Sequence, residues 1–276
     1  MKRARRHRVR PRGFTLVELL CCCVLVGLMI GLLLPALGAA REAGRGAGCA
    51  SNLRQLQLSL DAYANDNRSR YAPAAPDALA NRTRWFGSRA STSLSFDPQG
   101  GPLSDYLDGS AGEGVRKCGS FNPAGGPNAF ERACGGYGYN RFFVGAQMRR
   151  SEAAWLVEND RTGAATAGFS DPASVVSFAD CALFAGGGGV IEYSFAEPRW
   201  WPSNPSSRPD PSIHFRHGNG RARRSPGEAR LAWLDGHISG AARGFTWSSG
   251  VYGTPVSDPL LGWPSGPDDN TLFGSR

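Results

Sequence analysis

Three histidines and an aspartate near the carboxyl end are the residues whose types could do chemistry together. His214 and His217 lie close in the chain, and Asp235 and His237 follow after a polar stretch. Imidazole and carboxylate groups are ligands for zinc and partners in proton transfer. However, His214 and His217 fall on opposite faces of a strand, because side chains alternate along it. We therefore predict no metal site here, and a structural hydrogen bond between His217 and Asp235.

Catalytic motifs of recognisable spacing are missing from the sequence. It contains no Gly-x-Ser-x-Gly, no His-Glu-x-x-His and no glycine-rich dinucleotide loop before a helix. The run Gly186–Gly189 is not followed by Lys-Ser or Lys-Thr, so it is not a phosphate-binding loop. The sequence therefore predicts a protein that is not an enzyme.

A single carboxylate, Glu18, stands at the start of the longest apolar run. From Leu19 to Ala40 no residue is charged, which is long enough for one helix to cross a bilayer. A carboxylate inside a spanning segment costs on the order of 2–3 kcal/mol on insertion scales. A chain that keeps such a group is expected to use it, so Glu18 is a candidate functional residue.

The excess of positive charge lies before this run. Of the 31 basic residues, seven fall between Lys2 and Arg12, which leaves 24 against 23 acidic residues in the rest of the chain. By the positive-inside rule, these basic residues stay in the cytoplasm and the residues after about 40 lie outside. No basic stripe interleaves with aromatic residues elsewhere, so we expect no nucleic-acid binding.

The order of a basic leader, Gly13, Phe14 and then Glu18 resembles the amino-terminal signal of type IV prepilins and type II secretion pseudopilins. In that family a prepilin peptidase cuts after the glycine and methylates the new amino group, which implies cleavage between Gly13 and Phe14 and N-methylation of Phe14. The family's glutamate pairs with the amino terminus of a neighbouring subunit, which implies an assembly role for Glu18. The alternatives are a plain signal anchor and a secretory signal peptide that is cleaved near Ala40.

The resemblance implies an α+β, pilin-like fold. A long amino-terminal helix, first transmembrane and then amphipathic, would pack on an antiparallel β-sheet with long loop insertions. The chain would comprise a cytoplasmic leader at 1–13, a transmembrane helix at 14–40, an amphipathic continuation at 41–66 and an extracytoplasmic globular head at 67–276. It would be a single-pass protein of the inner membrane, with its amino terminus in the cytoplasm and its head in the periplasm.

The implied function is that of a structural subunit, a pseudopilin of a type II secretion system-like filament. Its partners would be the prepilin peptidase, other pilin or pseudopilin subunits in a homo- or hetero-oligomeric filament, the inner-membrane assembly platform and membrane lipid. The alternatives are a type IV pilin for adhesion or DNA uptake and a signal-anchored extracytoplasmic binding protein or enzyme.

Calcium is the cofactor that the resemblance brings into question. Some type II major pseudopilins bind calcium through a carboxy-terminal loop, and Asp258, Asp268 and Asp269 lie in such a tail. Their spacing does not match a calcium-binding loop. We therefore expect no cofactor, with calcium as the alternative.

The seven cysteines fall into two groups. Cys21–Cys23 lie in the apolar run and are interpreted as small packing residues, whereas the other four would lie where disulfides are permitted. Cys118 and Cys134 flank a loop rich in glycine, proline and asparagine, so we predict a disulfide between them. Closing a loop of about 15 residues contributes on the order of 3 kcal/mol. The remaining two are Cys49 and Cys181, and no Cys-x-x-Cys pair indicates zinc.

An amphipathic pattern continues the helix beyond Ala40. One face carries apolar residues at intervals of four, three, four and three, and the opposite face is polar. Pro35 removes a backbone donor from the apolar run, so we predict a helix kink there. Asn65, Asp66 and Asn67 end the helix. The apolar residues are Cys49, Leu53, Leu56, Leu60 and Tyr63, and the polar ones are Arg54, Gln57, Asp61 and Asn65.

Two further segments resemble a branch of pseudopilin-like proteins that is abundant in planctomycetes. The first is Cys-x-Asn-Leu-Arg-Gln-Leu, which starts at Cys49. The second is a carboxy-terminal motif of a histidine, nine residues and Asp-Gly. Here seventeen residues separate His217 from Asp235 and Gly236, and the polar segment 221–228 accounts for the difference.

Short strands are predicted in the head. Alternating or apolar runs favour strands at 137–144, 174–178, 213–217 and 229–234, the last two as a hairpin. Asp235-Gly236 is a tight-turn dipeptide that leads into a further strand from His237. Residues 197–212 contain two tryptophans and five prolines, and are interpreted as a surface loop.

Overall fold

The computed structural model describes residues 13–274, except for residues 79, 108–114, 116, 125–130, 186–188, 219–226, 249, 251–257 and 259. Residues 1–12 of the leader, most of the four-glycine run and most of the polar segment 221–228 therefore lie outside the described residues. The chain divides into two compact units, Met1–Arg41 and Glu42–Arg276. The helix α1 (Leu16–Asp66) begins in the first unit and ends in the second.

The described part of the first unit is the apolar start of α1. Every residue from 13 to 41 is exposed, and the most apolar window has a mean hydropathy of 2.7. A helix that is apolar on all sides requires an apolar environment, which a bilayer or a bundle of similar helices provides. In the part of the chain that the structure describes, α1 is the helix long and apolar enough to cross a membrane. Pro35 lies inside α1 without ending it, and its kink stays a prediction.

The second unit begins with the amphipathic end of α1. Leu53, Leu56 and Leu60 are at most 2% exposed, which confirms the predicted apolar face. Gln57 was expected on the polar face, but it is 1% exposed. The prediction was wrong because the Gln57 carboxamide has a buried partner: its oxygen accepts a hydrogen bond of 2.5 Å from the Ser177 hydroxyl.

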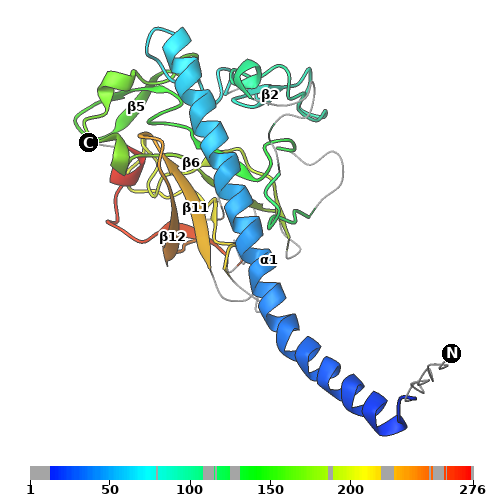
Figure 1. Ribbon diagram of the computed structural model, residues 1–276. Helices are drawn as coiled ribbons and strands as arrows, with labels where there is room; N and C mark the ends of the chain where they lie inside the picture. Colours follow the sequence, from blue (N-terminus) through cyan, green and yellow to red (C-terminus); the bar gives the residue numbers. More distant parts are fainter. Residues whose placement is uncertain are drawn as a thin grey trace, which may run out of the picture. The chain divides into compact units, whose positions relative to one another are not determined.

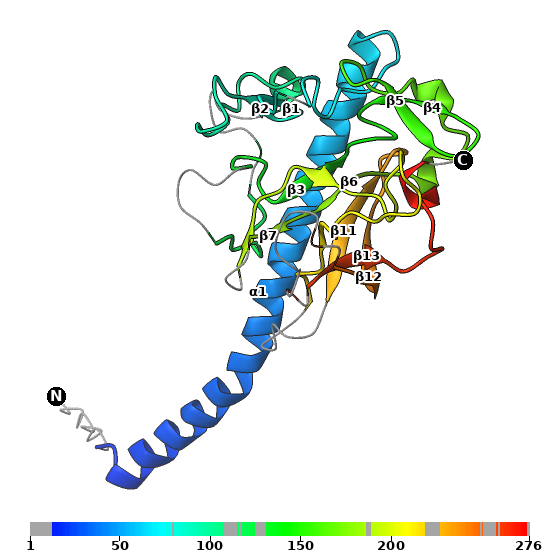
Figure 2. The same ribbon diagram turned by 180° about the vertical axis from the view of Figure 1, so that it is seen from behind.

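A seven-stranded sheet packs against this half of α1. The strand order is β10-β13-β12-β11-β6-β3-β9, with antiparallel pairs except for β3 and β9, which run parallel. The helix lies in front of the sheet in Figure 1 and behind it in Figure 2, so it covers one face. This arrangement confirms the α+β fold. The strands are β3 (Tyr137–Asn140), β6 (Val176–Asp180), β9 (Phe195–Ala196), β10 (Ile213–His214), β11 (Glu228–Trp233), β12 (Ile238–Phe245) and β13 (Leu261–Pro264).

Smaller elements surround the sheet. Three two-stranded sheets and four short 3-10 helices lie in the connecting segments of the described chain. The two-stranded sheets are β1 (Thr83–Arg84) with β2 (Gly87–Ser88), β4 (Gln147–Arg150) with β5 (Trp155–Asn159), and β7 (Leu183–Phe184) with β8 (Val190–Ile191). The 3-10 helices are η1 (Ser104–Tyr106), η2 (Thr166–Gly168), η3 (Pro172–Ser174) and η4 (Thr271–Phe273).

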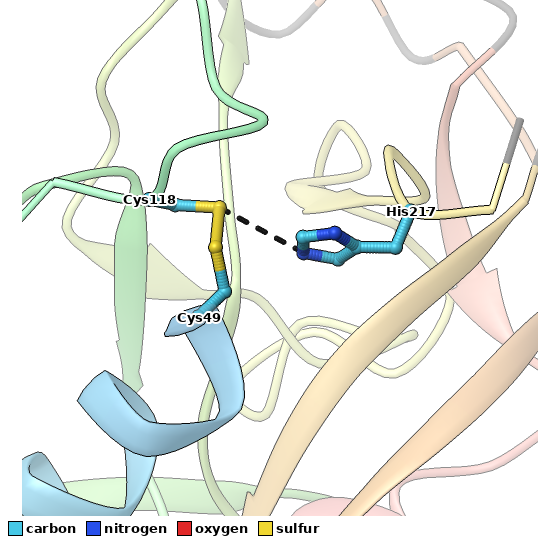
Figure 3. Close-up of side chains that lie close together, drawn as sticks. All are labelled: Cys49, Cys118 and His217. Atoms are coloured by element: carbon cyan, nitrogen blue, oxygen red, sulfur yellow. Dashed lines mark hydrogen bonds between the residues drawn. A yellow bond between two sulfur atoms is a disulfide. The ribbon is translucent and has the colours of Figure 1, made fainter. Parts of the chain in front are cut away.

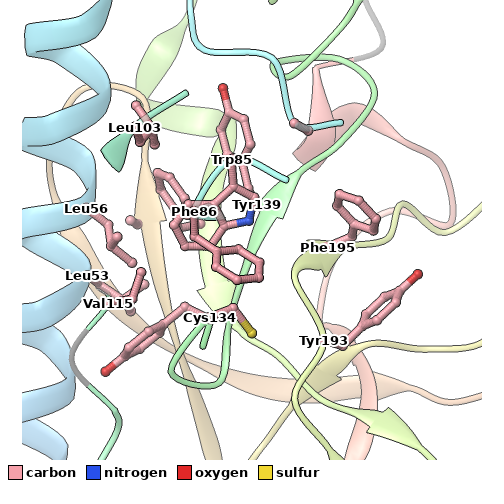
Figure 4. Packing of buried hydrophobic residues seen from close by; sticks show 14 of the residues in the cluster. Leu53, Leu56, Trp85, Phe86, Leu103, Val115, Cys134, Tyr139, Tyr193 and Phe195 are labelled. Carbon is pink, nitrogen blue, oxygen red and sulfur yellow. The ribbon is translucent and has the colours of Figure 1, made fainter. Parts of the chain in front are cut away.

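The core between α1 and the sheet is built largely from loop residues. Trp85, Phe86 and Leu103 have no exposed surface, and they face Leu53 and Leu56 of the helix (Figure 4). The indole N–H of Trp85 is satisfied because it donates to the Ser194 carbonyl at 2.8 Å. Side chains of the long insertions therefore form part of the core, although these insertions contain little regular secondary structure.

The segment 197–212 differs from its prediction. Glu197, Arg199 and Asp210 are at most 2% exposed, so much of this segment is buried rather than a surface loop. The backbone carbonyl of Glu197 accepts a hydrogen bond of 3.0 Å from the indole of Trp263 on β13. Trp201 of this segment packs against the second hydrophobic cluster, the Glu197 carboxylate accepts a hydrogen bond from Tyr193, and Arg199 donates to the Pro264 carbonyl.

The predicted strands are confirmed in part. The strand at 137–144 ends at Asn140, and the one at 174–178 runs from Val176 to Asp180 because η3 precedes it. The hairpin of 213–217 with 229–234 is reduced to one bridge between His217 and Glu228. β10 pairs instead with β13, while β11 pairs with β12 and β6.

Candidate functional site

The first candidate site is the start of α1. The Glu18 carboxylate accepts hydrogen bonds of 2.8 Å from both the backbone N–H and the hydroxyl of Thr15. The Glu18 backbone N–H donates in return to the Thr15 hydroxyl at 3.2 Å. This reciprocal arrangement is a capping box, which satisfies backbone donors that the first helical turn leaves free. The spacing Thr-x-x-Glu, from Thr15 to Glu18, is the sequence signal of this cap.

The cleavage-site residues lie just before this cap. Phe14 is 75% exposed, and Gly13 is also exposed; both lie before the start of the helix. Phe14, whose nitrogen cleavage would turn into an amino group, is four residues before Glu18 in the sequence. The structure joins Thr15 to Glu18, and the roles of Gly13, Phe14 and Glu18 in cleavage, methylation and assembly stay predictions.

The second candidate site is a buried cluster of charged residues in the head. Asp180 has no exposed surface, and one of its carboxylate oxygens accepts a hydrogen bond of 2.6 Å from Arg216. The other oxygen lies 3.0 Å from Nε2 of His217 and accepts a hydrogen bond of 2.7 Å from the Arg230 backbone N–H. Asp180 thus holds β6, β11 and the segment after β10 together.

A disulfide brings α1 into this cluster. Cys49 of α1 is bonded to Cys118, and Nε2 of His217 lies 3.7 Å from the Cys118 sulfur (Figure 3). Nδ1 of His217 lies 3.6 Å from a carboxylate oxygen of Glu42, which is itself bonded to the Ser120 hydroxyl at 2.8 Å. From here on, the head means the second unit, Glu42–Arg276. Glu42, the disulfide and His217 therefore attach the first turns of α1 in this unit to the rest of the head. We name Glu42, Cys49, Cys118, Asp180, Arg216 and His217 the anchor cluster.

The disulfide corrects the predicted pairing of Cys118 with Cys134. Cys134 is a free, fully buried thiol, and burial together with the nearby carboxylates of Glu192 and Glu131 raises its pKa well above the usual value. Cys49 lies on the apolar face of α1, and packing of that face brings its Cα to 5.1 Å from that of Cys118. The prediction failed because the pairing depends on where the helix crosses the loop, and not on the distance along the chain.

The structure also separates His217 from Asp235. His217 pairs with Glu228 at the start of β11, whereas Asp235 follows the end of β11, and six strand residues span about 17 Å. The predicted His217–Asp235 hydrogen bond is therefore wrong. Asp235 accepts bonds of 3.1 and 2.6 Å from the backbone and Nδ1 of His237, and Gly236 has a φ of +92°. Asp235 and Gly236 thus form the exposed turn between β11 and β12.

Burial and charge in and beside the anchor cluster lower the pKa values of Asp180 and His214. Burial alone would raise the pKa of Asp180, but the Arg216 charge and bonds from His217 and Arg230 outweigh it and lower that pKa. Burial of His214, followed by the charge of Arg216, lowers the His214 pKa to about 3. Asp180 therefore stays ionised and His214 stays neutral down to acid pH.

The stability of the head is expected to fall as the pH is lowered from about 6.5 to 4.5. Unfolded His214 binds a proton in this range while the folded residue, with its pKa near 3, does not, so each pH unit costs up to about 1.4 kcal/mol. Asp180 contributes mainly at lower pH, since its folded pKa is lowered and its stabilisation is lost as the unfolded carboxyl group takes up a proton around pH 3.8. Urea unfolding at several pH values measures the slope.

A matched pair of variants tests whether His214 causes this pH dependence of stability. His214→Gln is expected to flatten it, whereas His237→Gln is expected to keep it, because the His237 side chain is 46% exposed. An unchanged slope in His214→Gln would contradict the assignment.

Potential metal ligands gather at one place in the described chain. The ligand atoms of Cys49, Cys118 and His217 lie within 4.8 Å of one another. The two sulfurs are bonded to each other, and the thiolate rather than the disulfide is the metal ligand, so the group is a cross-link beside an imidazole.

The carboxy-terminal aspartates have other partners. Asp268 accepts bonds of 2.8 and 2.7 Å from the guanidinium of Arg208, Asp269 accepts from Thr271, and Asp258 accepts from the Leu260 backbone. Each of the three carboxylates binds protein groups close to it, and we propose no calcium site here.

Comparison with known families supports the interpretation of the amino-terminal segment. Residues 8–34 match the prokaryotic N-terminal methylation motif, a stretch that contains Gly13, Phe14 and Glu18. No curated protein and no solved structure matches the chain significantly. The match covers a small part of the chain, so it bears on the amino-terminal segment, while the head is understood from its own structure.

Proposed function

We propose that this chain, which fits the type IV prepilin and pseudopilin family, is a pseudopilin of a type II secretion system-like filament. The observation that carries the proposal is Glu18, held by Thr15 in the first turn of an apolar helix that is exposed on all sides. A carboxylate in this position is unfavourable in a bilayer unless a positive group compensates it. The amino terminus of a neighbouring subunit is that group.

The proposed mechanism begins in the inner membrane. The basic leader stays in the cytoplasm, and the prepilin peptidase cuts between Gly13 and Phe14 and methylates the amine of Phe14. The assembly platform then adds the subunit to the filament, where apolar helices bundle and the methylated amine of one subunit meets Glu18 of the next. Pairing these charges offsets the desolvation of both, which sets the register of neighbouring subunits.

The head contributes a firm attachment to α1. The anchor cluster joins Cys49 to a loop through the disulfide and places Glu42 beside His217, in the segment after β10 where Arg216 forms a buried ion pair with Asp180 of β6. A filament that extends from the membrane pulls on the helix and meets resistance at the head. The disulfide at Cys49 keeps the part of α1 that follows it packed on the sheet under this load. This supports a structural rather than a catalytic role.

The mature protein is expected to begin at Phe14 with a methylated amino group. Cleavage would remove the seven basic residues and leave the amine near Glu18, and intact-mass and amino-terminal peptide mass spectrometry of membrane fractions measure both changes. Gly13→Val is the control, since a bulky residue before the cut should leave the precursor intact. Material that begins at Met1 or after Ala40 would refute processing by a prepilin peptidase.

The principal alternative is a type IV pilin for adhesion or DNA uptake. It shares the amino-terminal processing and differs in where the filament lies. Electron microscopy with antibody against the head separates the two functions, because a pseudopilin gives short periplasmic filaments and a type IV pilin gives long surface fibres.

A further inference from the structure

A hollow of about 310 Å³ on the head is lined by three of the chain's seven tryptophans. Trp155 starts β5, and Trp200 and Trp201 lie in the segment 197–212; all three are partly exposed. We name this place the tryptophan hollow. Its polar rim is formed by Arg150, Glu152, Asp268, Asp269 and Asn270.

The three indoles are held in place by the structure beneath them. Trp155 packs edge-on against Phe143 at 5.7 Å, and Trp201 packs edge-on against Phe142 at 5.8 Å. Asn270, only 8% exposed, clamps Trp200 by accepting from its backbone N–H at 2.9 Å and donating to its carbonyl at 2.8 Å. A site whose side chains are already ordered loses little conformational entropy when a ligand binds.

The charges around the hollow are balanced. The lining contains three carboxylates, on Glu152, Asp268 and Asp269, and two arginines outside the lining bind Asp268. Arg208 and Arg199 lie within salt-bridge distance of Asp268, at 2.7 and 3.8 Å. The third guanidinium belongs to Arg150 on the rim.

This balance selects against charged ligands. The guanidinium of Arg208 lies 3.6 Å from the centre of the Trp200 ring, so Arg208 already occupies the place over this ring that a cationic ligand would take. An anion would meet the carboxylates, and a cation would meet the arginines. The rim offers both hydrogen-bond donors and acceptors, which suits a neutral ligand rich in hydroxyl groups, because each hydroxyl both donates and accepts.

We propose that the tryptophan hollow binds a neutral polysaccharide. The apolar C–H faces of pyranose rings pack on the partly exposed indoles, which combine a large apolar surface with a polar edge. Sugar hydroxyls donate to the carboxylates and accept from Arg150. A hollow of about 310 Å³ with aromatic walls and a few polar groups is at the lower end of the size range of small-ligand sites. The proposal assigns the head a ligand and is independent of the filament function.

The test uses the full-length chain in a polyoxyethylene detergent, which carries no sugar. Cellohexaose, chitohexaose, mannohexaose and xylohexaose are titrated by calorimetry and tryptophan fluorescence, with hexagalacturonate and choline as the acidic and cationic probes. At least one neutral hexasaccharide is expected to bind, and Trp201→Ala is expected to lower the affinity for it by about tenfold or more. Trp247→Ala is the matched control, because Trp247 is 52% exposed and outside the hollow.

A second variant protects the test against misfolding. Trp201 packs on Phe142, so Trp201→Ala is interpreted only if its urea unfolding curve matches that of the wild type. Glu152 is exposed on the rim, and Glu152→Ala is expected to weaken binding about threefold without affecting the fold. The proposal would be overturned if none of the four neutral probes bound, or if hexagalacturonate or choline bound more tightly than they do. It would also be overturned if Glu152→Ala and folded Trp201→Ala both bound the neutral probe with wild-type affinity.

Discussion

Replacing Glu18 by glutamine is expected to leave membrane insertion intact and to abolish filament assembly. Glutamine removes the charge that would pair with a neighbour's amine, yet it retains an oxygen that accepts the capping bonds of Thr15. Removing the charge also makes insertion more favourable, because a charged side chain costs more to place in a bilayer than a neutral amide does. Shear fractionation and electron microscopy measure filament yield, and membrane flotation measures insertion.

The Thr15 side chain supplies the control for this experiment. Thr15→Ala removes the hydroxyl that bonds to Glu18 and weakens the helix start by about 1 kcal/mol, but it keeps the carboxylate. We therefore expect Thr15→Ala to assemble. If Glu18→Gln assembled as well as the wild type while Thr15→Ala did not, Glu18 would act only as a helix cap, and the charge-pairing mechanism would be wrong.

Cys49→Ser is expected to lower the unfolding free energy of the head by about 4 kcal/mol. The disulfide joins residues 69 positions apart, and the chain-entropy model gives about this value for a loop of that length. This is a large share of the roughly 5–15 kcal/mol by which folded proteins are stable. Urea unfolding in detergent, followed by tryptophan fluorescence, measures the change.

Reductant and a second cysteine variant test which thiols pair. Wild-type protein with dithiothreitol should match Cys49→Ser, which should itself be insensitive to reductant. Cys134→Ala should keep the full reductant sensitivity, since Cys134 is a free thiol. If Cys134→Ala lost that sensitivity and Cys49→Ser kept it, the pairing of Cys49 with Cys118 would be wrong.

The long helix was predictable because its signals are local. An uncharged run of sufficient length, a 3–4 apolar spacing and the Asn-Asp-Asn end are each contained within a few turns. They predicted a helix over 14–66, and α1 spans Leu16–Asp66. The burial of Gln57 was not predictable, since it depends on a serine that lies 120 residues further along the chain.

The anchor cluster shows the limit of motif reasoning. His217 was singled out by its place before Asp-Gly, and it does lie in a buried site. Its partner is Asp180, a residue that no spacing rule connects with it. Asp180 becomes the partner because β6 and β11 are neighbours in the sheet, which places its carboxylate beside the backbone of Arg230.

The tryptophan hollow was also beyond sequence reasoning. Trp200 and Trp201 were noted as aromatic residues of a loop, but Trp155 comes from β5 and Asn270 from a segment 70 residues after Trp200. Only the packing of these segments against each other creates the hollow.

The amino acid sequence by itself determined the methylation motif at residues 8–34 and the long apolar helix, because both depend on residues close together in the chain, while the roles of Gly13, Phe14 and Glu18 stay predictions. The tertiary structure alone decided the partners of Cys49 and His217 and the grouping of the tryptophans. The physical reason is that helix geometry follows from neighbours in sequence, whereas disulfides, buried ion pairs and binding hollows depend on which distant segments pack together.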